Sequence, residues 1–326
     1  MATRCRPSII PTAAVAASFW CKSNFDTPHS TKTDTNYNRW TLNCAVSCLP
    51  KNAAPHNLLS RNPVGLNCCG EDAFIIAEND FQIVLAVADG VGSWRSKGVD
   101  PSAFSRGLMK QLERIVIGER EIDSEKGYVD SSTNQPSGPT ASMILLKSSF
   151  WRLIRGYFKG MSKPFGSSTV CIVSLDKSNG KLDTCNLGDS GFVIIRGNRI
   201  VARSMAQQHR FNAPFQLMLT PDGDVNDCSH MSASHTFSLQ SDDLVIVASD
   251  GLWDNLFEND ILSIVMNEKP IKPTEIATRL VGQARKFAER EDYDSPFSVE
   301  SRRHGKNHQG GKLDDITVIV GVVQSK

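Results

Sequence analysis

Short runs of apolar residues predict buried β-strands from about residue 70 onward. Residues 81–88, 244–249 and 316–323 are nearly continuous apolar stretches rich in valine, isoleucine and alanine. Such runs are typical of strands covered on both faces, since a strand with one wet face alternates apolar and polar residues. Residues 182–195 hold two further apolar stretches around Gly188-Asp189-Ser190-Gly191, and this pattern predicts a hairpin.

Helical periodicity occupies segments between these runs. Asp100-Pro101 provides an N-cap and a first-turn proline, and apolar residues follow at helical spacing as far as Val116. Similar apolar stripes predict helices over residues 141–158, 259–266 and 273–289. Polar stretches rich in glycine, serine and asparagine predict loops over residues 120–138 and 291–311. No apolar run approaches the roughly 18 residues of a membrane-spanning helix.

The first 65 residues differ from the rest and are expected to form an N-terminal extension. Residues 1–69 contain seven lysines and arginines but two acids, Asp26 and Asp34, and are rich in small hydroxylated residues. Early arginines with few acids are typical of a mitochondrial transit peptide, which favours the mitochondrial matrix as the location. A weak secretory signal over residues 8–20 and a plain disordered tail in a cytoplasmic protein remain alternatives. Residues 66–326 are then the catalytic domain.

Overall composition narrows the function classes. Apolar residues make up 40% of the chain, enough for a packed core. The formal net charge of +1 gives no support for binding nucleic acid or a membrane surface. The nine cysteines show neither the spacing of a zinc ribbon nor a C-x-x-C motif, so free thiols in a reducing compartment are expected.

Aspartates stand at the ends of the predicted core strands. Asp89-Gly90 and Asp250-Gly251 each end an apolar run, Asp314-Asp315 precedes another, and Asp189 lies in the predicted hairpin turn. Each motif taken alone is better explained as a turn, since Asp-Gly is a common turn dipeptide. If the strand ends converge, however, the carboxylates repel one another and need a multivalent cation. Oxygen ligands without histidine partners suit Mg²⁺ or Mn²⁺, and Gly90 allows its own carbonyl to approach such an ion.

A site made of acids and divalent ions points to phosphoryl chemistry. A thiol phosphatase would need C-x₅-R, and a P-loop enzyme would need G-x₄-G-K-[ST]; both motifs are missing from the sequence. The seven histidines contain no H-E-x-x-H pattern, which argues against a zinc hydrolase.

Six motifs, taken in order, resemble those of the metal-dependent type 2C protein serine/threonine phosphatases. They are Gly70-Glu71-Asp72, Ala88-Asp89-Gly90-Val91-Gly92, Gly166-Ser167-Ser168-Thr169, Asn186-Leu187-Gly188-Asp189-Ser190, Ala248-Ser249-Asp250-Gly251-Leu252-Trp253-Asp254 and Asp314-Asp315-Ile316-Thr317. The resemblance covers about residues 66–324 and is greatest to the mitochondrial branch of that family. It implies an α+β fold, a four-layer α-β-β-α sandwich in which helices flank two central antiparallel β-sheets.

The same resemblance implies a site with two Mg²⁺ or Mn²⁺ ions. Asp89 matches the carboxylate that bridges both ions, and Gly90 matches a backbone-carbonyl ligand. Asp250 and Asp314 match ligands of the other ion. These aspartates are therefore the expected catalytic set.

Further acids have supporting roles in the resemblance. Glu71 and Asp72 match acids that hold ion-bound waters. Asp189 matches a ligand of a weaker third ion, with Asp254 nearby. A turn and a helix cap explain Asp189 and Asp254 equally well.

The sequence departs from the common family pattern at two positions. Asn67 stands where many members have an arginine that grips the substrate phosphate, and Val91 stands where many have a histidine proposed to protonate the leaving group. Arg95 and Lys97, just after the first metal strand, are the candidates for binding phosphate instead.

We therefore expect a protein serine/threonine phosphatase that acts on phosphoserine and phosphothreonine through a metal-activated water. The two departures favour, as an alternative, a catalytically weak pseudophosphatase that acts as a regulatory binding module. A phosphatase acting on a small metabolite is a third possibility, because the acids define the reaction and not the substrate. The expected partners are phosphorylated proteins, and a monomer is the default state.

Overall fold

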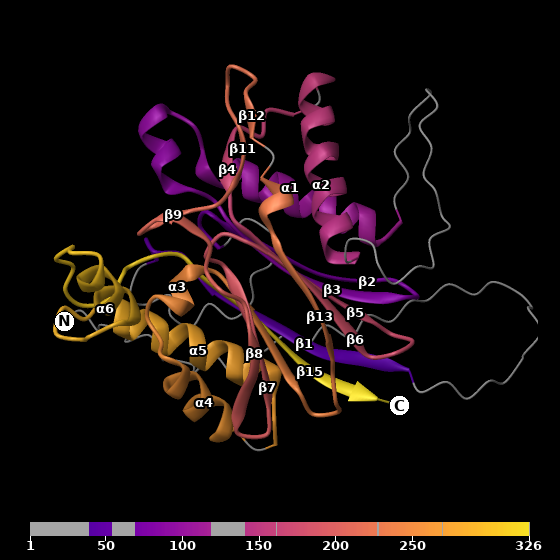
Figure 1. The fold of residues 1–326 in the computed structure, drawn as a ribbon, viewed down its shortest axis with the longest axis vertical. Coiled ribbons are helices and arrows are strands. Elements are labelled where there is room, and N and C mark those ends of the chain that lie inside the picture. The colour runs from indigo at the N-terminus through magenta and orange to yellow at the C-terminus, as the bar shows by residue number, and fades with distance from the viewer. Residues whose placement is uncertain are drawn as a thin grey trace, which may run out of the picture.

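The computed structural model describes residues 39–53, 69–118, 141–160, 162–226, 228–268 and 270–325. Two five-stranded antiparallel sheets face each other, and helices cover the outer face of each sheet (Figure 1). This arrangement confirms the predicted α-β-β-α sandwich. Across the described residues, no helix has both the length and the hydropathy needed to cross a membrane.

Each sheet draws its strands from distant parts of the sequence. The first has the order β1 (Trp40–Leu49), β15 (Ile316–Ser325), β14 (Leu244–Ala248), β7 (Gly191–Arg196) and β8 (Arg199–Arg203). The second has the order β13 (Ala233–Ser238), β6 (Lys181–Leu187), β5 (Val170–Asp176), β3 (Gln82–Asp89) and β2 (Asp72–Glu78). Two small sheets join β12 (Val225–Asn226), β11 (Leu217–Leu219) and β4 (Gly166–Ser168), and β10 (Ala213–Pro214) and β9 (Gln208–Arg210).

The helices divide between the two outer faces, as Figure 1 shows. The second sheet is covered by α1 (Pro101–Val116) and α2 (Ala141–Phe158). The first sheet side carries α3 (Asp250–Trp253), α4 (Glu258–Met266), α5 (Pro273–Ala288) and α6 (Pro296–Arg303). Short 3₁₀ helices are η2 (Gly92–Lys97) and η3 (Ser229–Met231).

Burial on both faces explains the continuous apolar runs. In β3, Leu85 and Val87 pack between the sheets, whereas Val84 and Ala86 pack beneath α1 and α2. The residues of β14 alternate in the same way between the inter-sheet core and the core under α5. Successive side chains of a strand point to opposite faces, so a central strand of a four-layer sandwich needs apolar residues at every position.

The predicted hairpin over residues 182–195 is wrong. β6 pairs with β5 and β13, whereas β7 pairs with β14 and β8 in the opposite sheet. Gly188, at φ +98°, makes the turn between them, a conformation that favours glycine. The connection therefore crosses the sandwich and leaves Asp189 at the edge where the two sheets meet.

The loop predicted over residues 291–311 contains a helix. The Ser295 side chain accepts a hydrogen bond from the Ser298 N–H at 3.0 Å, and Pro296 follows as the first helical residue of α6. Serine followed by proline is a regular helix start. The polar composition of the segment concealed this signal.

The boundary predicted after residue 65 is also wrong. β1 pairs with β15 along its whole length, from Trp40 opposite Ser325 to Leu49 opposite Ile316, and α5 packs on it. Trp40–Leu49 is therefore part of the folded domain. Residues 1–38 of the predicted extension lie outside the described part of the chain, so the transit peptide predicted there stays a prediction.

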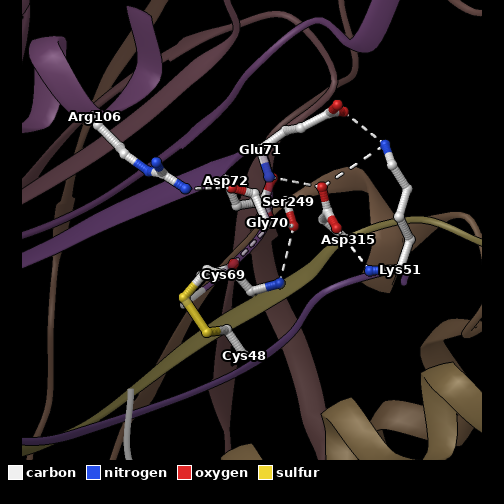
Figure 2. The surroundings of a disulfide bond; sticks show 10 residues. Cys48, Lys51, Cys69, Gly70, Glu71, Asp72, Arg106, Ser249 and Asp315 are labelled. Carbon is white, nitrogen blue, oxygen red and sulfur yellow. Dashed lines mark hydrogen bonds and ion pairs between the residues drawn. A yellow bond between two sulfur atoms is a disulfide. The ribbon is translucent and has the colours of Figure 1, made fainter. Parts of the chain in front are cut away.

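A disulfide joins Cys48, near the end of β1, to Cys69, three residues before β2 (Figure 2). Their Cα atoms are 5.5 Å apart, within the range that a disulfide spans. The expectation of free thiols is therefore wrong for this pair, and holds for Cys44, Cys171, Cys185 and Cys228. The cysteine spacing carries no hint of the bond, because the pairing of β1 with β15 brings the two residues together.

Candidate metal centre

Acidic residues from both sheets gather at one edge of the sandwich. Asp72 and Asp89 are cross-strand partners at adjoining ends of β2 and β3. Asp72 Oδ2 accepts hydrogen bonds from Ser249 Oγ and Thr317 Oγ1, each at 2.7 Å. Since Ser249 follows β14 and Thr317 lies in β15, these bonds join the strand ends of one sheet to those of the other.

Three carboxylates form a compact oxygen cluster. Oxygen atoms of Asp89, Asp189 and Asp250 all lie within 4.8 Å of one another. Asp189 Oδ1 and Asp250 Oδ1 are buried and accept no hydrogen bond. A buried carboxylate oxygen without a partner is costly unless a cation compensates it. The all-oxygen donor set and these two orphaned atoms fit a hard divalent ion such as Mg²⁺ or Mn²⁺.

The acids are electrostatically frustrated. Burial, together with the charges of Asp250, Asp72 and Asp314, raises the pKa of Asp89 well above its ordinary value. Burial and the charge of Asp250 likewise raise the pKa of Asp189 to about 7. These carboxylates resist ionisation together, and a divalent cation among them would relieve that repulsion.

Asp314 lies outside this trio and forms ion pairs with two lysines. Its Oδ1 lies 3.4 Å from Lys51 Nζ, and its Oδ2 lies 3.2 Å from Lys312 Nζ. The sequence predicted that Asp89, Asp250 and Asp314 would gather. The structure brings Asp189 into the compact trio and places Asp314 beside it.

The acids before β2 have different partners. Glu71 accepts from Lys51 Nζ at 2.6 Å and from Arg95 at 2.7 Å. Asp72 is fully buried, and its Oδ1 has no hydrogen-bond partner. Asp72 therefore connects the two sheets through Oδ2, while its Oδ1 accepts no hydrogen bond from the protein.

Glycine at position 90 was predicted to let its carbonyl approach a metal ion, and the structure adds a steric requirement for glycine there. A Cβ at this position would overlap the carbonyl oxygen of Pro101 and lie 2.7 Å from that of Glu71. Glycine therefore lets the chain after Asp89 pass closely between α1 and the Glu71 segment.

Lys51 and Lys312 near the acids escaped sequence reasoning, and Asp315 was quoted there as part of a motif without a role of its own. Lys51 was assigned to the extension, although it lies two residues after the end of β1. Lys312 lies two residues before Asp314, so that spacing was its only signal. Asp315 Oδ1 accepts from the Lys51 N–H at 2.7 Å and its Oδ2 from the Glu71 N–H at 2.8 Å (Figure 2). Asp315 thus positions the two residues that flank the cluster.

The two predicted phosphate-binding residues have different surroundings. Arg95 reaches Glu71, while its side chain remains 67% exposed. Lys97 instead lies over the Trp94 ring, 4.6 Å from its centroid. Next to the acids, Lys51, Arg95 and Arg106 line a cavity of about 220 Å³. A larger cavity of about 580 Å³ includes Gln82, at the opposite end of β3 from Asp89, and is remote from the acids.

Proton release should control how well this site binds metal. Burial raises the pKa of Asp254 to about 8, although the Lys312 ammonium opposes the shift, and Asp189 titrates at about 7. Because bound ions need ionised carboxylates, Mn²⁺ affinity measured by calorimetry should rise as the pH increases from about 6 to about 9. The raised pKa values also mean that the folded state holds protons the unfolded state lacks. The metal-stripped protein should therefore lose stability over the window from about pH 4 to about pH 8. A pH-independent Mn²⁺ affinity would contradict this expectation.

Comparison with known proteins identifies the class. The model of the family Protein phosphatase 2C matches residues 227–292. Protein phosphatase PTC7 homolog of Danio rerio is 40% identical over 266 residues, covering 78% of this chain and 82% of that protein. The Homo sapiens PTC7 homolog is 39% identical over 265 residues, covering 78% and 80%.

A solved structure agrees with these relatives. The X-ray structure of the photosystem II phosphatase PBCP has a TM-score of 0.66 and 28% identity, and the match covers 87% of this chain and 99% of that one. The chain therefore belongs to the protein phosphatase 2C family and is a metal-dependent protein phosphatase. Within that family, its similarity to the PTC7 homologues agrees with the branch predicted from the sequence motifs.

Proposed function

We propose that the protein hydrolyses phosphoserine and phosphothreonine at a site for two Mg²⁺ or Mn²⁺ ions, with a weaker third. The main support is the convergence of Asp89, Asp189 and Asp250 with two buried, unpartnered carboxylate oxygens. Asp89, the Gly90 carbonyl, Asp250 and Asp314 would hold the two ions, and Asp189 with Asp254 nearby would serve the third. Ions bound there supply Lewis-acid activation of water and of the phosphoryl group.

The surrounding side chains would orient the reactants. Asp72, fixed by Ser249 and Thr317, keeps one oxygen directed toward no protein donor, and Glu71 is fixed by Lys51 and Arg95. These acids can accept hydrogen bonds from water at the site. Val91 offers no proton, and we propose that water at the site would protonate the leaving oxygen instead.

Of the two phosphate-binding candidates from the sequence, Arg95 and Lys97, we propose Arg95, with Lys51 beside it. A guanidinium that uses one donor on Glu71 retains further N–H groups for a phosphate oxygen. Arg95→Ala should raise KM for a phosphopeptide by roughly 10-fold with a smaller change in kcat, because ground-state binding is lost. Lys97→Ala is the matched control, since Lys97 lies on the Trp94 ring and should change KM little. Equal KM values for Arg95→Ala and the wild type would remove Arg95 from this role.

A phosphatase assay with and without metal tests the function. Protein treated with EDTA should not hydrolyse p-nitrophenyl phosphate or a phosphothreonine peptide, and added Mn²⁺ should restore both activities. Activity that survives EDTA, or a complete lack of turnover with Mn²⁺, would overturn the proposal. Hydrolysis of small phosphomonoesters but not of phosphopeptides would favour a metabolite phosphatase.

Asn67 and Val91 support a second candidate, a weak pseudophosphatase that acts as a binding module. General-acid catalysis contributes about 10²–10⁴ in rate, so the loss of the family histidine would slow an enzyme without abolishing it. The retained acid cluster supports the enzyme over the binding module. Metal-independent binding of a phosphoprotein without turnover would reverse that preference.

We also propose the mitochondrial matrix as the location, on the basis of the basic, acid-poor N-terminal segment. N-terminal sequencing of protein recovered from mitochondria should find residues missing from that end. An intact Met1 on cytosolic protein would contradict this proposal.

A further inference from the structure

Lys312 places an ammonium group among the predicted metal ligands. Its Nζ forms ion pairs with Asp250 Oδ2, with Asp254 Oδ2 at 2.7 Å and with Asp314 Oδ2 at 3.2 Å. Its side chain is 16% exposed. Two of the three carboxylates, Asp250 and Asp314, are the ones proposed to hold the same divalent ion.

The backbone of Lys312 is held by the side chain of Asn255. Asn255 Oδ1 accepts from the Lys312 N–H at 2.9 Å, and Asn255 Nδ2 donates to the Lys312 carbonyl oxygen at 2.8 Å. The same Nδ2 donates to the Gly251 carbonyl at 3.0 Å. Asn255 therefore connects the backbone of Lys312 to α3, the short helix that begins with Asp250. This connection places the lysine beside the acids.

Beyond this anchored backbone, the ammonium has an aromatic neighbour as well as the three carboxylates. The ammonium also lies 5.2 Å from the centroid of the Phe297 ring, on the face of which a cation is stabilised. The ammonium therefore has contacts with Asp254 and Phe297 that do not involve Asp250 or Asp314.

We propose that Lys312 is an internal cation that competes with divalent ions for Asp250 and Asp314 and so sets the metal affinity of the site. The inference rests on the proposed metal centre. A carboxylate oxygen that accepts from an ammonium is a poorer ligand, and a positive charge a few ångströms from a divalent ion repels it. A lysine ammonium ordinarily has a pKa of about 10.4, so the side chain that makes these three ion pairs carries its charge at neutral pH.

A single lysine then has two opposite effects. It stabilises the acid cluster when divalent ions are scarce, because it offsets carboxylate repulsion. It also weakens metal binding, because the ions must overcome both the ion pairs and the repulsion. A residue with a merely structural role would not produce tighter metal binding when removed.

The experiment is a Mn²⁺ titration of EDTA-stripped, dialysed protein, with free Mn²⁺ followed by electron paramagnetic resonance. The neutral variants Lys312→Met and Lys312→Gln should bind Mn²⁺ at least about 10-fold more tightly than the wild type. Lys312→Arg keeps the charge and should resemble the wild type. Lys306→Met, at an exposed lysine six positions earlier in the chain, is the control and should also resemble the wild type.

Thermal melts provide the second readout. Stripped Lys312→Met and Lys312→Gln should melt below the wild type, and saturating Mn²⁺ should reduce the difference. If both neutral variants bind Mn²⁺ no more tightly than a wild type that binds Mn²⁺ and hydrolyses phosphate, the Lys312 inference is wrong and the proposed function stands. If the wild type shows no saturable Mn²⁺ binding, the metal centre and the Lys312 inference both fall.

Discussion

Replacing Asp89 with alanine should lower kcat for p-nitrophenyl phosphate by at least about 10³-fold at saturating Mn²⁺, because the carboxylate proposed to contact both ions is lost. In protein stripped of metal, by contrast, the substitution should not lower the thermal stability. The pKa of Asp89 is raised by burial and by its acidic neighbours, so its removal relieves repulsion. The stripped variant should therefore melt no lower than the stripped wild type, while Mn²⁺ should stabilise it less.

The matched control is Asp222→Ala, at an exposed acid in a turn remote in sequence from the cluster motifs. Its kcat and its Mn²⁺-dependent melting should equal those of the wild type. Asp89→Asn keeps the shape of the side chain and should be nearly as inactive as the alanine variant. Activity within a few-fold of the wild type in either Asp89 variant would exclude a catalytic role for this carboxylate.

Replacing Gly251 with alanine should lower the free energy of unfolding by about 3 kcal/mol, the upper end of the range typical of forced overlap in a packed core. A Cβ at residue 251 would overlap the backbone carbonyl oxygen of Asp315 and lie 3.0 Å from its carbonyl carbon. Backbone atoms cannot rotate out of the way, so α3 must move away from the start of β15. That movement would also separate Asp250 from Asp314, and Mn²⁺ affinity should fall with stability.

Gly282→Ala is the control for this substitution. Gly282 lies exposed on α5, and a Cβ there would meet no atom within 4 Å. Alanine is favoured over glycine inside a helix, so this variant should gain about 0.5–1 kcal/mol. Urea denaturation measures both variants. A Gly251→Ala variant as stable as the wild type would show that the backbone at the start of β15 can shift without cost.

Local patterns predicted the buried strands and the first helix, whereas the four-layer arrangement was implied by the family resemblance. Continuous apolar runs over β3, β14 and β15 predicted strands covered on both faces, and their alternation between two cores confirms that interpretation. The start of α1 was equally clear, since the Asp100 side chain accepts from the Ser102 N–H at 3.0 Å. These signals are readable because each depends on neighbours in sequence.

The missed features depend on partners distant in sequence. β6 and β7 resemble a hairpin locally, but each finds its neighbours in a different sheet. β1 is only partly buried, so its polar and small residues resemble a tail until β15 is placed beside it. The same pairing positions Cys48 for its disulfide and brings Lys51 close to the acids. Neither contact could be inferred before β1 was placed beside β15.

The site was predicted only in part, again because some of its contacts join residues that are distant in sequence. Acids at strand ends can be found in the sequence, and the structure places Asp89 and Asp250 together as expected. Which cations reach those acids depends on side chains from other elements. Lys51 and Lys312 therefore entered only with the three-dimensional arrangement.

The pairing of β1 with β15 limits how the N-terminus can be trimmed. β15 is held by β14 on one side and by β1 on the other. If proteolytic maturation or recombinant truncation removed Trp40–Leu49, the backbone N–H and C=O groups along one side of a valine-rich strand would become a free template. Such a product would be prone to edge-to-edge self-association. Any leader that is removed must therefore be cut upstream of Trp40.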